Sequence, residues 1–336
     1  MPGAFSLIVN PAAGGGRSLR LLPAAAAALD ELGLSYEITT SASLQHAREL
    51  AAAAAGAGKV VVAVGGDGLA GALAGVTATG SATFAIIPAG RGNDLARVLG
   101  IPVQPRAAAG VLARGQTRRI DLISVGTPGQ PECIVAGSVY AGVPSMAGEI
   151  ANAARWLRGP AVYPAAALRA LAAWHPVRFR LEPAASAPAL ASAPALAPAP
   201  ALALAPREFA GYAVVIANSA YFGAGMMVAP PARIDDGILD IVAMRDGPRL
   251  AFVRVLLKIR TGSHVGLAQI GLDRAAAVTL TMDQAMPVAA DGETLPWACP
   301  LPAGAALTVR ALPAALTVLA PCADGQVSED LPTSPA

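Results

Sequence analysis

A glycine-rich turn near residue 65 is the first place where residue types and spacing could support chemistry. Residues 59–64 form an apolar run, and Gly65, Gly66, Asp67 and Gly68 follow it directly. Glycines between a strand and a helix let a ligand approach the backbone, and the N–H groups there favour an anion such as phosphate. Because the Asp67 carboxylate repels phosphate, we expect a Mg²⁺ ion between them, or a role for Asp67 as a base or structural cap. A tight turn with no ligand is the alternative.

Two further turns have a similar composition and follow the apolar segments at residues 5–9 and 83–87. Both are rich in glycine and carry an arginine and an asparagine, so they are candidates for binding phosphate groups. For Arg17 a solvated side chain at a helix start is an equal alternative. The candidate contacts are Asn10, Pro11, Gly14 and Arg17 in the first turn and Gly90, Arg91 and Asn93 in the second.

Two common nucleotide-binding motifs are missing from the chain. It contains neither GxxxxGKS/T nor a GxGxxG followed by an acidic residue about 20 positions later. Walker-type and Rossmann-type binding are therefore both disfavoured.

The elements that must position these turns alternate between strands and helices. Such alternation is typical of βαβ units with a parallel sheet. In such a sheet the three turns emerge along one carboxyl edge, where open α/β sheets bind ligands, so we expect one nucleotide site. The predicted strands are residues 5–9, 35–39, 59–64 and 83–87, and the predicted helices are residues 18–32, 44–55, 69–76 and 94–99.

After about residue 118 the chain changes to strands with few crossover helices, which predicts a mainly antiparallel second domain. The predicted strands are residues 119–125, 134–140, 177–181, 211–218, 237–244 and 276–282, and the predicted helices are residues 146–157 and 165–174.

We divide the chain into a nucleotide domain at residues 1–125, a second domain at residues 126–320 and a disordered tail at residues 321–336. Residues 183–206 are built from Ala, Pro, Leu and Ser. Because proline recurs every few residues, we predict an extended loop inserted between two neighbouring strands.

The composition argues against several classes of protein. The formal net charge of +2 is small and dispersed, so no nucleic-acid-binding surface is indicated. The three cysteines are far apart and lack CxxC spacing, which predicts neither a disulfide framework nor a zinc site. No run of about 18 apolar residues is free of Gly, Pro or charge, and no signal-peptide pattern is present. We therefore expect a cytoplasmic protein without a transmembrane span.

The turns and several later segments resemble a known family. VNPAAGGGR at residues 9–17, VGGDG at residues 64–68 and PAGRGNDLAR at residues 88–97 have the order and spacing of the diacylglycerol kinase catalytic family, which includes bacterial lipid kinases and sphingosine kinases. YFGAGM at residues 221–226, DDGILD at residues 235–240 and DGE at residues 291–293 agree with it. The resemblance implies an α/β nucleotide domain of the NAD kinase-like type followed by a β-sandwich domain that carries the lipid site.

By this resemblance, the protein would transfer the γ-phosphate of ATP to the hydroxyl group of diacylglycerol or a similar long-chain lipid alcohol. ATP and Mg²⁺ would be the cofactors. The lipid would be met at a membrane surface, which would place the protein at the inner face of the membrane, and a homodimer is compatible with the family. The expected nucleotide contacts are Asn10 with the loop after it, Thr40, residues 65–68 and the loop around Arg91.

The resemblance also assigns roles to two acidic motifs. Asp291 and Glu293 would supply the group that takes the proton from the lipid hydroxyl, with Asp291 the first candidate and Glu293 the second. Asp236, with the backbone carbonyls of Arg233 and Ile238, would hold a structural Mg²⁺. Without the resemblance, a polar hairpin turn at residues 291–293 and a turn before a strand at residues 235–237 are the simpler interpretations.

The chain departs from the family pattern after Gly68. Leu69 stands where Thr is usual, Gly71 and Ala72 replace an Asn-Glu or His-Glu pair, and Arg91 stands where Thr is common. Two alternatives therefore stay open. An NAD kinase-like enzyme would share the GGDG turn, and a catalytically inactive nucleotide- or lipid-binding regulator would explain the missing hydroxyl and acid.

Overall fold

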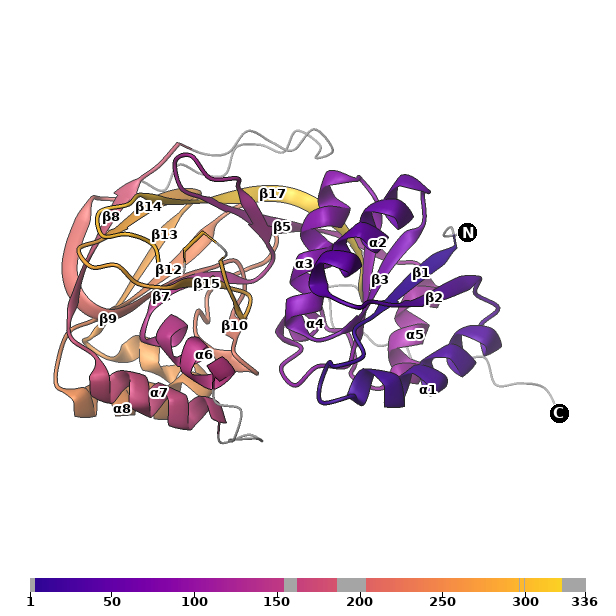
Figure 1. Ribbon diagram of the computed structural model, residues 1–336, viewed down its shortest axis with the longest axis horizontal. Coiled ribbons are helices and arrows are strands. Elements are labelled where there is room, and N and C mark those ends of the chain that lie inside the picture. Colours follow the sequence, from indigo (N-terminus) through magenta and orange to yellow (C-terminus); the bar gives the residue numbers. More distant parts are fainter. Residues whose placement is uncertain (1–3, 154–161, 186–203, 296, 299, 322–336) are drawn as a thin grey trace.

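The computed structural model describes residues 4–153, 162–185, 204–295, 297–298 and 300–321, which form two lobes (Figure 1). Two long strands, β5 (Thr117–Gly126) and β17 (Leu307–Leu319), pair with each other and run from one lobe into the other. Nearly all of the predicted tail, most of the predicted Ala-Pro loop and the end of the predicted helix at residues 146–157 lie outside the described residues.

The first lobe is an α/β layer structure, as predicted. Its parallel strands lie in the order β2-β1-β3-β4, and β17 continues the sheet beside β4. Helices α1 and α5 pack together, and α2 packs on α3. The elements are β1 (Phe5–Val9), α1 (Arg17–Glu31), β2 (Tyr36–Thr40), α2 (Leu44–Gly56), β3 (Val60–Gly65), α3 (Asp67–Thr79), β4 (Thr83–Pro88), α4 (Asp94–Val98) and α5 (Pro105–Arg114).

The strand order contains the feature that positions a ligand. β1 has β2 on one side and β3 on the other, so the chain reverses its direction of winding between β1 and β3. In open α/β sheets, ligands bind outside the carboxyl ends of strands at such a switch point. Every residue of β3 is buried, as expected for a parallel strand covered on both faces.

The second lobe is built from antiparallel strands, as predicted, with three helices gathered at its lower end in Figure 1. In β8, buried Val177, Phe179 and Leu181 alternate with exposed Arg178 and Arg180, which is the period of a strand with one solvated face. The elements are β6 (Cys133–Val135), β7 (Ser138–Gly142), α6 (Val143–Ala153), α7 (Val162–Ala173), β8 (Val177–Pro183), β9 (Arg207–Ala217), β10 (Tyr221–Phe222), β11 (Met226–Met227), β12 (Leu239–Arg245), α8 (Arg249–Lys258), the 3₁₀ turns η1 (Ile259–Thr261) and η2 (Ser263–Gly266), β13 (Ile270–Ala275), β14 (Ala277–Met282), β15 (Val288–Ala290) and β16 (Glu293–Thr294).

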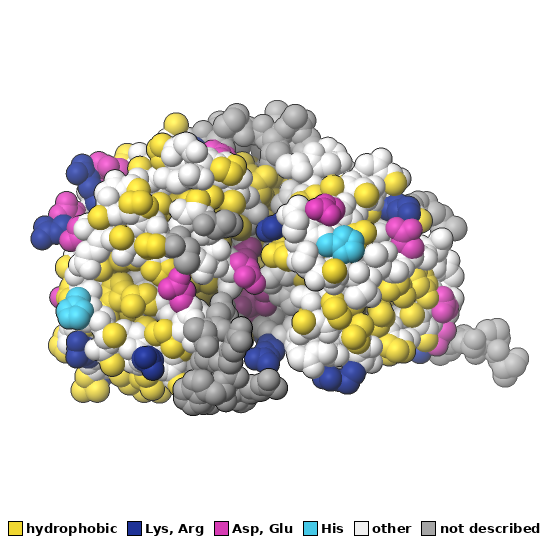
Figure 2. All heavy atoms as spheres, in the orientation of Figure 1, with side chains coloured by type: hydrophobic (Ala, Val, Ile, Leu, Met, Phe, Trp, Pro, Cys, Tyr) yellow, Lys and Arg dark blue, Asp and Glu magenta, His cyan; other side chains and the backbone are white. Residues whose placement is uncertain are grey.

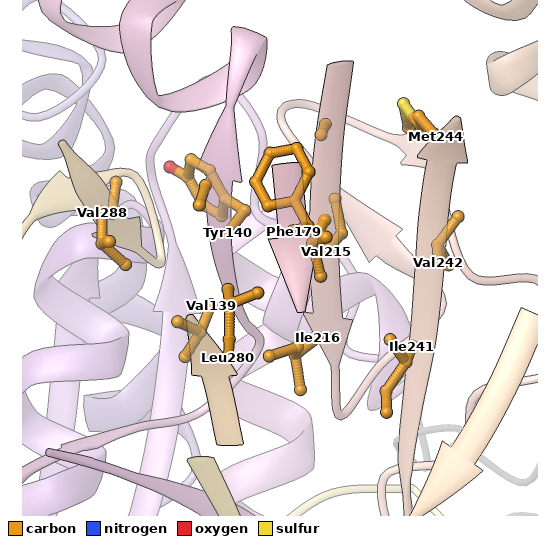
Figure 3. Close-up of a cluster of buried hydrophobic side chains, with 14 of the residues drawn as sticks. Val139, Tyr140, Phe179, Val215, Ile216, Ile241, Val242, Met244, Leu280 and Val288 are labelled. Carbon is orange, nitrogen blue, oxygen red and sulfur yellow. The ribbon is translucent and has the colours of Figure 1, made fainter. Parts of the chain in front are cut away.

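Each lobe has its own hydrophobic core. In the second lobe, side chains from β7, β9, β12 and β14 meet between the strands (Figure 3). The Ala-Pro loop connects β8 and β9, which pair with each other, so its predicted place between neighbouring strands is confirmed. The predicted domain boundaries stay predictions, because β5 and β17 belong to both lobes.

One predicted strand is interrupted in the structure, and several elements were not predicted. The predicted strand at residues 134–140 is interrupted between β6 and β7, because the N–H groups of residues 136–138 bond to a side chain instead of a strand. Helices α5 and α8 were not predicted, and neither was β17. Within the described residues, none of the helices has the length and apolar composition needed to cross a bilayer.

Candidate active site

The three glycine-rich turns meet at the carboxyl edge of the first-lobe sheet. The turns after β3 and β4 touch each other: a Cβ placed on Gly90 would lie 2.4 Å from the Gly66 Cα. The turn after β1 joins them, since a Cβ on Gly14 would lie 2.6 Å from the Ala89 carbonyl oxygen. Only glycine allows this packing, so the glycines fix the shape of the edge.

The turn after β1 also has an unusual backbone. Gly14, Gly15 and Gly16 have consecutive φ values of 58°, 70° and 83°, which is the left-handed region. Helix α1 then begins at Arg17. Helix α3 begins at Asp67, so two helix N-termini start at this edge and favour a bound anion.

The two asparagines shape their turns. The Asn93 side chain accepts from the Gly90 N–H at 2.8 Å and donates to the Gly90 carbonyl at 3.2 Å. The Asn10 Oδ1 accepts from the Ala12 N–H at 3.0 Å. Sequence reasoning treated both as nucleotide contacts, whereas the structure shows each folding its own turn.

The remaining predicted nucleotide contacts lie at the same edge. Thr40 ends β2, is exposed and is paired with Val9 of β1. Arg91 is exposed and Arg17 is half-buried, and neither guanidinium forms an ion pair with any described residue. Pro11 lies in the turn after β1, and Gly65 and Gly68 flank the start of α3. The structure therefore brings the predicted set together.

The half-buried Asp67 lies beside a buried carboxylate, Asp94, that sequence reasoning did not select. The Asp67 Oδ1 accepts from the Leu95 N–H at 3.3 Å, at the start of α4. Asp94, also at that helix start, accepts from the N–H groups of Ala224 at 2.9 Å and Gly225 at 2.7 Å in the second lobe. Burial, followed by the neighbouring Asp67 charge, raises the pKa of Asp94 to about 6. Burial also raises the pKa of Asp67.

Asp291 is enclosed by backbone donors from another part of the second lobe. Its Oδ2 accepts from the Ala136 N–H at 2.7 Å, and its Oδ1 accepts from Gly137 and Ser138, each at 2.9 Å. A Cβ on Gly71 of α3 would lie 2.7 Å from Asp291 Oδ2. The glycine that departs from the family pattern therefore leaves room for this carboxylate. Burial raises the pKa of Asp291.

The DGE motif forms a two-residue hairpin turn between β15 and β16, which was the simpler interpretation. Asp291 and Gly292 have φ values of 48° and 91°, as a type I′ turn requires. Glu293 begins β16 and is exposed, and its carboxylate has no hydrogen-bond partner among the described residues. A Cβ on Gly68 would lie 3.2 Å from Glu293 Oε1, so this carboxylate faces the glycine-rich turn.

The predicted metal residues lie at a different place, on the second-lobe side of the junction. Asp236 Oδ1 accepts from the Ile238 N–H at 3.1 Å, and Oδ2 accepts from Arg274 at 2.5 Å. The Arg233 side chain lies 3.5 Å from Asp235, whereas the predicted ligand at this residue is its backbone carbonyl. Both oxygens of Asp236 thus have protein donors, and a guanidinium supplies the positive charge. The Mg²⁺ site expected from Asp236 and the backbone carbonyls of Arg233 and Ile238 therefore stays a prediction.

Two side chains hold the lobes together: Asp121, which the sequence did not single out, and Asn218, which the sequence placed beside the family-like segment at residues 221–226. Asp121 on β5 accepts from the N–H groups of Ala314 and Gly237, both at 2.6 Å. The Asn218 side chain donates to the carbonyls of Asp121 and Ala136, at 2.8 and 3.0 Å. Asp121 lies in a strand shortly after a pair of basic residues. This local sequence does not indicate that Asp121 holds the lobes together.

Acidic side chains line the hollow between the two lobes in the space-filling view (Figure 2). Another hollow, of about 740 Å³, lies at the amino edge of the first-lobe sheet, between Lys59, Thr83 and Thr117. This hollow is far from the carboxylates of the candidate site, because the length of the strands separates the amino edge of the sheet from its carboxyl edge. Within the described residues, no three His, Cys, Asp or Glu side chains form a metal site by themselves.

Comparisons with known proteins agree with this architecture. Residues 4–125 match the family described as the diacylglycerol kinase catalytic domain, and residues 137–320 match the YegS C-terminal NAD kinase beta sandwich-like domain. A diacylglycerol kinase of Mycobacterium tuberculosis is 32% identical over 321 residues, covering 95% of this chain and 96% of that protein.

Proteins with lower sequence identity to this chain are also described as lipid or diacylglycerol kinases. A protein of Stenotrophomonas maltophilia described as "Probable lipid kinase YegS-like" is 29% identical over 220 residues, covering 63% of this chain and 64% of that protein. The crystal structure of a diacylglycerol kinase from Bacillus anthracis superposes with a TM-score of 0.61 at 18% identity, covering 95% of this chain and 97% of that one. The geometry of the glycine-rich edge and these matches together show that the chain belongs to the diacylglycerol kinase catalytic family.

Proposed function

We propose that the protein is an ATP-dependent lipid kinase that transfers the γ-phosphate of ATP to the hydroxyl group of diacylglycerol or a similar long-chain lipid alcohol. The observation that carries the proposal is the position of Glu293, a carboxylate without a protein partner among the described residues, opposite the glycine-rich turn. A phosphate group on that turn and a base facing it are what the transfer of a phosphoryl group to an alcohol needs.

The nucleotide would lie on the glycine-rich edge. The start of α3 leaves the N–H groups of its first turn without intrahelical partners at the switch point of the sheet, whereas the Gly15 and Gly16 N–H groups bond to the carbonyls of Ala12 and Ala13, each at 3.1 Å. Arg17 and Arg91 have no acidic partner among the described residues, so both are available for phosphate oxygens. Thr40 at the end of β2 is available for the rest of the nucleotide.

Asp67 is the residue that would hold a Mg²⁺ ion that arrives with the nucleotide. Magnesium is commonly bound by one or two carboxylates plus substrate phosphates, and Asp67 supplies such a carboxylate at the start of α3, inside the glycine-rich turn. Burial and then the neighbouring Asp67 charge raise the pKa of Asp94, so a cation beside the two carboxylates would relieve their repulsion. Such an ion would neutralise phosphate charge.

We assign the general base to Glu293 and a positioning role to Asp291. Three N–H donors hold the Asp291 carboxylate in a fixed orientation, whereas the Glu293 carboxylate has no hydrogen-bond partner among the described residues and is free to turn toward a substrate hydroxyl. In the transfer step, the Glu293 carboxylate takes the proton of the lipid hydroxyl while that oxygen attacks the γ-phosphorus. The bond from the γ-phosphorus to the β-phosphate oxygen breaks, and ADP leaves.

The test is transfer of label from γ-labelled ATP to lipid alcohols in detergent micelles, with NAD as an additional acceptor. We expect label on a lipid alcohol, and a decrease in kcat of about 100-fold or more for Glu293→Gln. Glu182→Gln, which changes a partly exposed glutamate paired with Arg180, is the control and should leave kcat unchanged.

The outcomes separate the alternatives. Transfer to NAD alone would favour the NAD kinase-like reading. ATP binding measured by calorimetry without transfer to any acceptor would favour the inactive regulator. Leu69 and Gly71, which depart from the family pattern, are the reason for considering that alternative. Full activity of Glu293→Gln would remove Glu293 as the base.

A further inference from the structure

Helix α8 presents leucines to solvent on the side facing away from the core. Leu250 is 67% exposed and Leu257 is 75% exposed, the highest values among the large hydrophobic side chains described. The two leucines are seven residues apart, so they lie on one face of the helix about two turns from each other. The opposite face, with Phe252, Val255 and Ile259, is buried in the second-lobe core.

Basic side chains surround these leucines. Arg254 and Lys258 follow Leu250 at steps of four residues, and Arg249 and Arg260 lie at the two ends; all four basic residues are exposed. From residue 247 to residue 272 the chain contains no Asp or Glu. We call Arg249, Leu250, Arg254, Leu257, Lys258 and Arg260 the basic leucine face.

The charges of this face lack ion-pair partners in the part of the chain that the structure describes. Arg254, Lys258 and Arg260 form no ion pair with any described residue, and Arg249 donates only to the Trp174 carbonyl, at 3.4 Å. Arg254 and Lys258 repel each other at a spacing of four residues. An external anion removes that repulsion, and an apolar phase covers the leucines.

We propose that the basic leucine face docks on a lipid bilayer that contains anionic phospholipids. A helix with exposed leucines in the middle of one face and cations beside them fits the boundary between headgroups and acyl chains. Each basic residue adds attraction to an anionic leaflet. The charge is complementary to an anionic lipid surface and repels a second copy of the same face.

The position of the face connects it with the candidate active site. The Arg249 bond to Trp174 joins the start of α8 to the segment that follows α7. Helix α6 packs against α7 and also against β16, the strand that begins with Glu293. The three helices lie together at the lower end of the second lobe (Figure 1), and Lys, Arg and hydrophobic side chains mingle on that part of the surface (Figure 2). Docking there would bring the lobe that carries Glu293 against the bilayer.

The test is cosedimentation of the whole protein with vesicles of phosphatidylcholine alone or mixed with phosphatidylglycerol, in the absence of ATP. We expect binding to the mixed vesicles to be tighter by about tenfold or more, and to weaken with added salt. Changing Arg254→Gln together with Lys258→Gln should lower the affinity for mixed vesicles by about tenfold or more, since each charge contributes about fivefold. Leu250→Ser with Leu257→Ser should cause a similar loss.

Matched controls carry the same changes elsewhere. Arg48→Gln with Arg114→Gln removes two exposed charges from the first lobe, and Leu272→Ser removes a leucine of β13 that is 41% exposed. Both controls should bind as the wild type does. All variants should keep kcat on a lipid alcohol in detergent micelles, because the basic leucine face does not touch the proposed reacting groups.

Three results would overturn docking. Equal affinity for both kinds of vesicle would exclude a role for charge in binding. Unchanged affinity in both double variants would exclude α8 as the docking surface. A wild-type dimer in gel filtration that dissociates on Leu250→Ser with Leu257→Ser, together with no vesicle binding, assigns the face to a second copy instead. Docking rests on the proposed function, because it would bring a lipid kinase to its substrate. Vesicle binding is measured without turnover, so a failure of docking can be distinguished from a failure of phosphoryl transfer.

Discussion

Replacing Asp291 should damage folding more than chemistry, whereas replacing Glu293 should do the reverse. Asp291→Ala removes the acceptor of three backbone N–H groups, at residues 136–138. A buried donor left without a partner costs about 1–3 kcal/mol. We use the low end, because burial also disfavours the charge of this carboxylate. The expected loss is about 3 kcal/mol, which is a large part of the roughly 5–15 kcal/mol that stabilises a protein.

The assay combines urea unfolding with amide hydrogen exchange. In Asp291→Ala, the amides of Ala136, Gly137 and Ser138 should exchange much faster than in the wild type. In Glu293→Gln, stability and these amides should be unchanged while kcat falls. Asp283→Ala is the matched control: this exposed aspartate accepts one backbone N–H, from Arg178 at 2.9 Å, and its loss should cost about 1 kcal/mol.

Asp291→Asn makes the distinction sharper. The amide keeps one acceptor oxygen for two of the three donors and turns an N–H toward the third, so a loss of about 1–2 kcal/mol is expected. If Asp291→Asn abolished transfer with unchanged stability and unchanged exchange at residues 136–138, the positioning role would be refuted and Asp291 would be the better base.

Three further predictions concern the first-lobe edge and the junction. Gly90→Ala should weaken ATP binding in calorimetry by about tenfold or more, because its Cβ would lie 2.4 Å from a neighbouring Cα, whereas Gly56→Ala, with open space around it, should bind normally. The folded pKa of Asp94, about 6, is above its unfolded value of 3.8, so its contribution to stability is full below pH 3.8 and lost as pH rises through 6. Asp94→Asn should therefore flatten the fall in unfolding free energy over that range, by up to about 3 kcal/mol, and an unchanged slope would contradict it. Arg274→Gln should lower stability by about 2 kcal/mol and make the melting temperature rise with Mg²⁺, unlike the wild type, because Asp236 and Asp240 lose their shared cation.

The sequence by itself determined the first lobe and the place of its site. Buried valine-rich strands and alanine-rich helices have different periods, so β1 to β4 and α1 to α4 could be located from local pattern, whereas α5 and β17 were missed. The turns at Asn10, Gly65 and Gly90 stand at strand ends, and a parallel sheet must bring those ends to one edge. The candidate nucleotide contacts were therefore predictable, and the structure places them together.

Only the tertiary structure decided which side chains are free to act there. Asp291 and Glu293 are both carboxylates of one short motif, so the sequence does not distinguish their roles. Asp291 accepts hydrogen bonds from residues about 150 positions earlier in the chain, and no local pattern predicts such a contact. Asp94 has a raised pKa because the fold buries it beside Asp67. The exposed face of α8 likewise could not be predicted from the sequence, because the exposure of a helix depends on what packs against it. Periodicity locates elements along the chain, whereas burial and partnership come from the contacts between them.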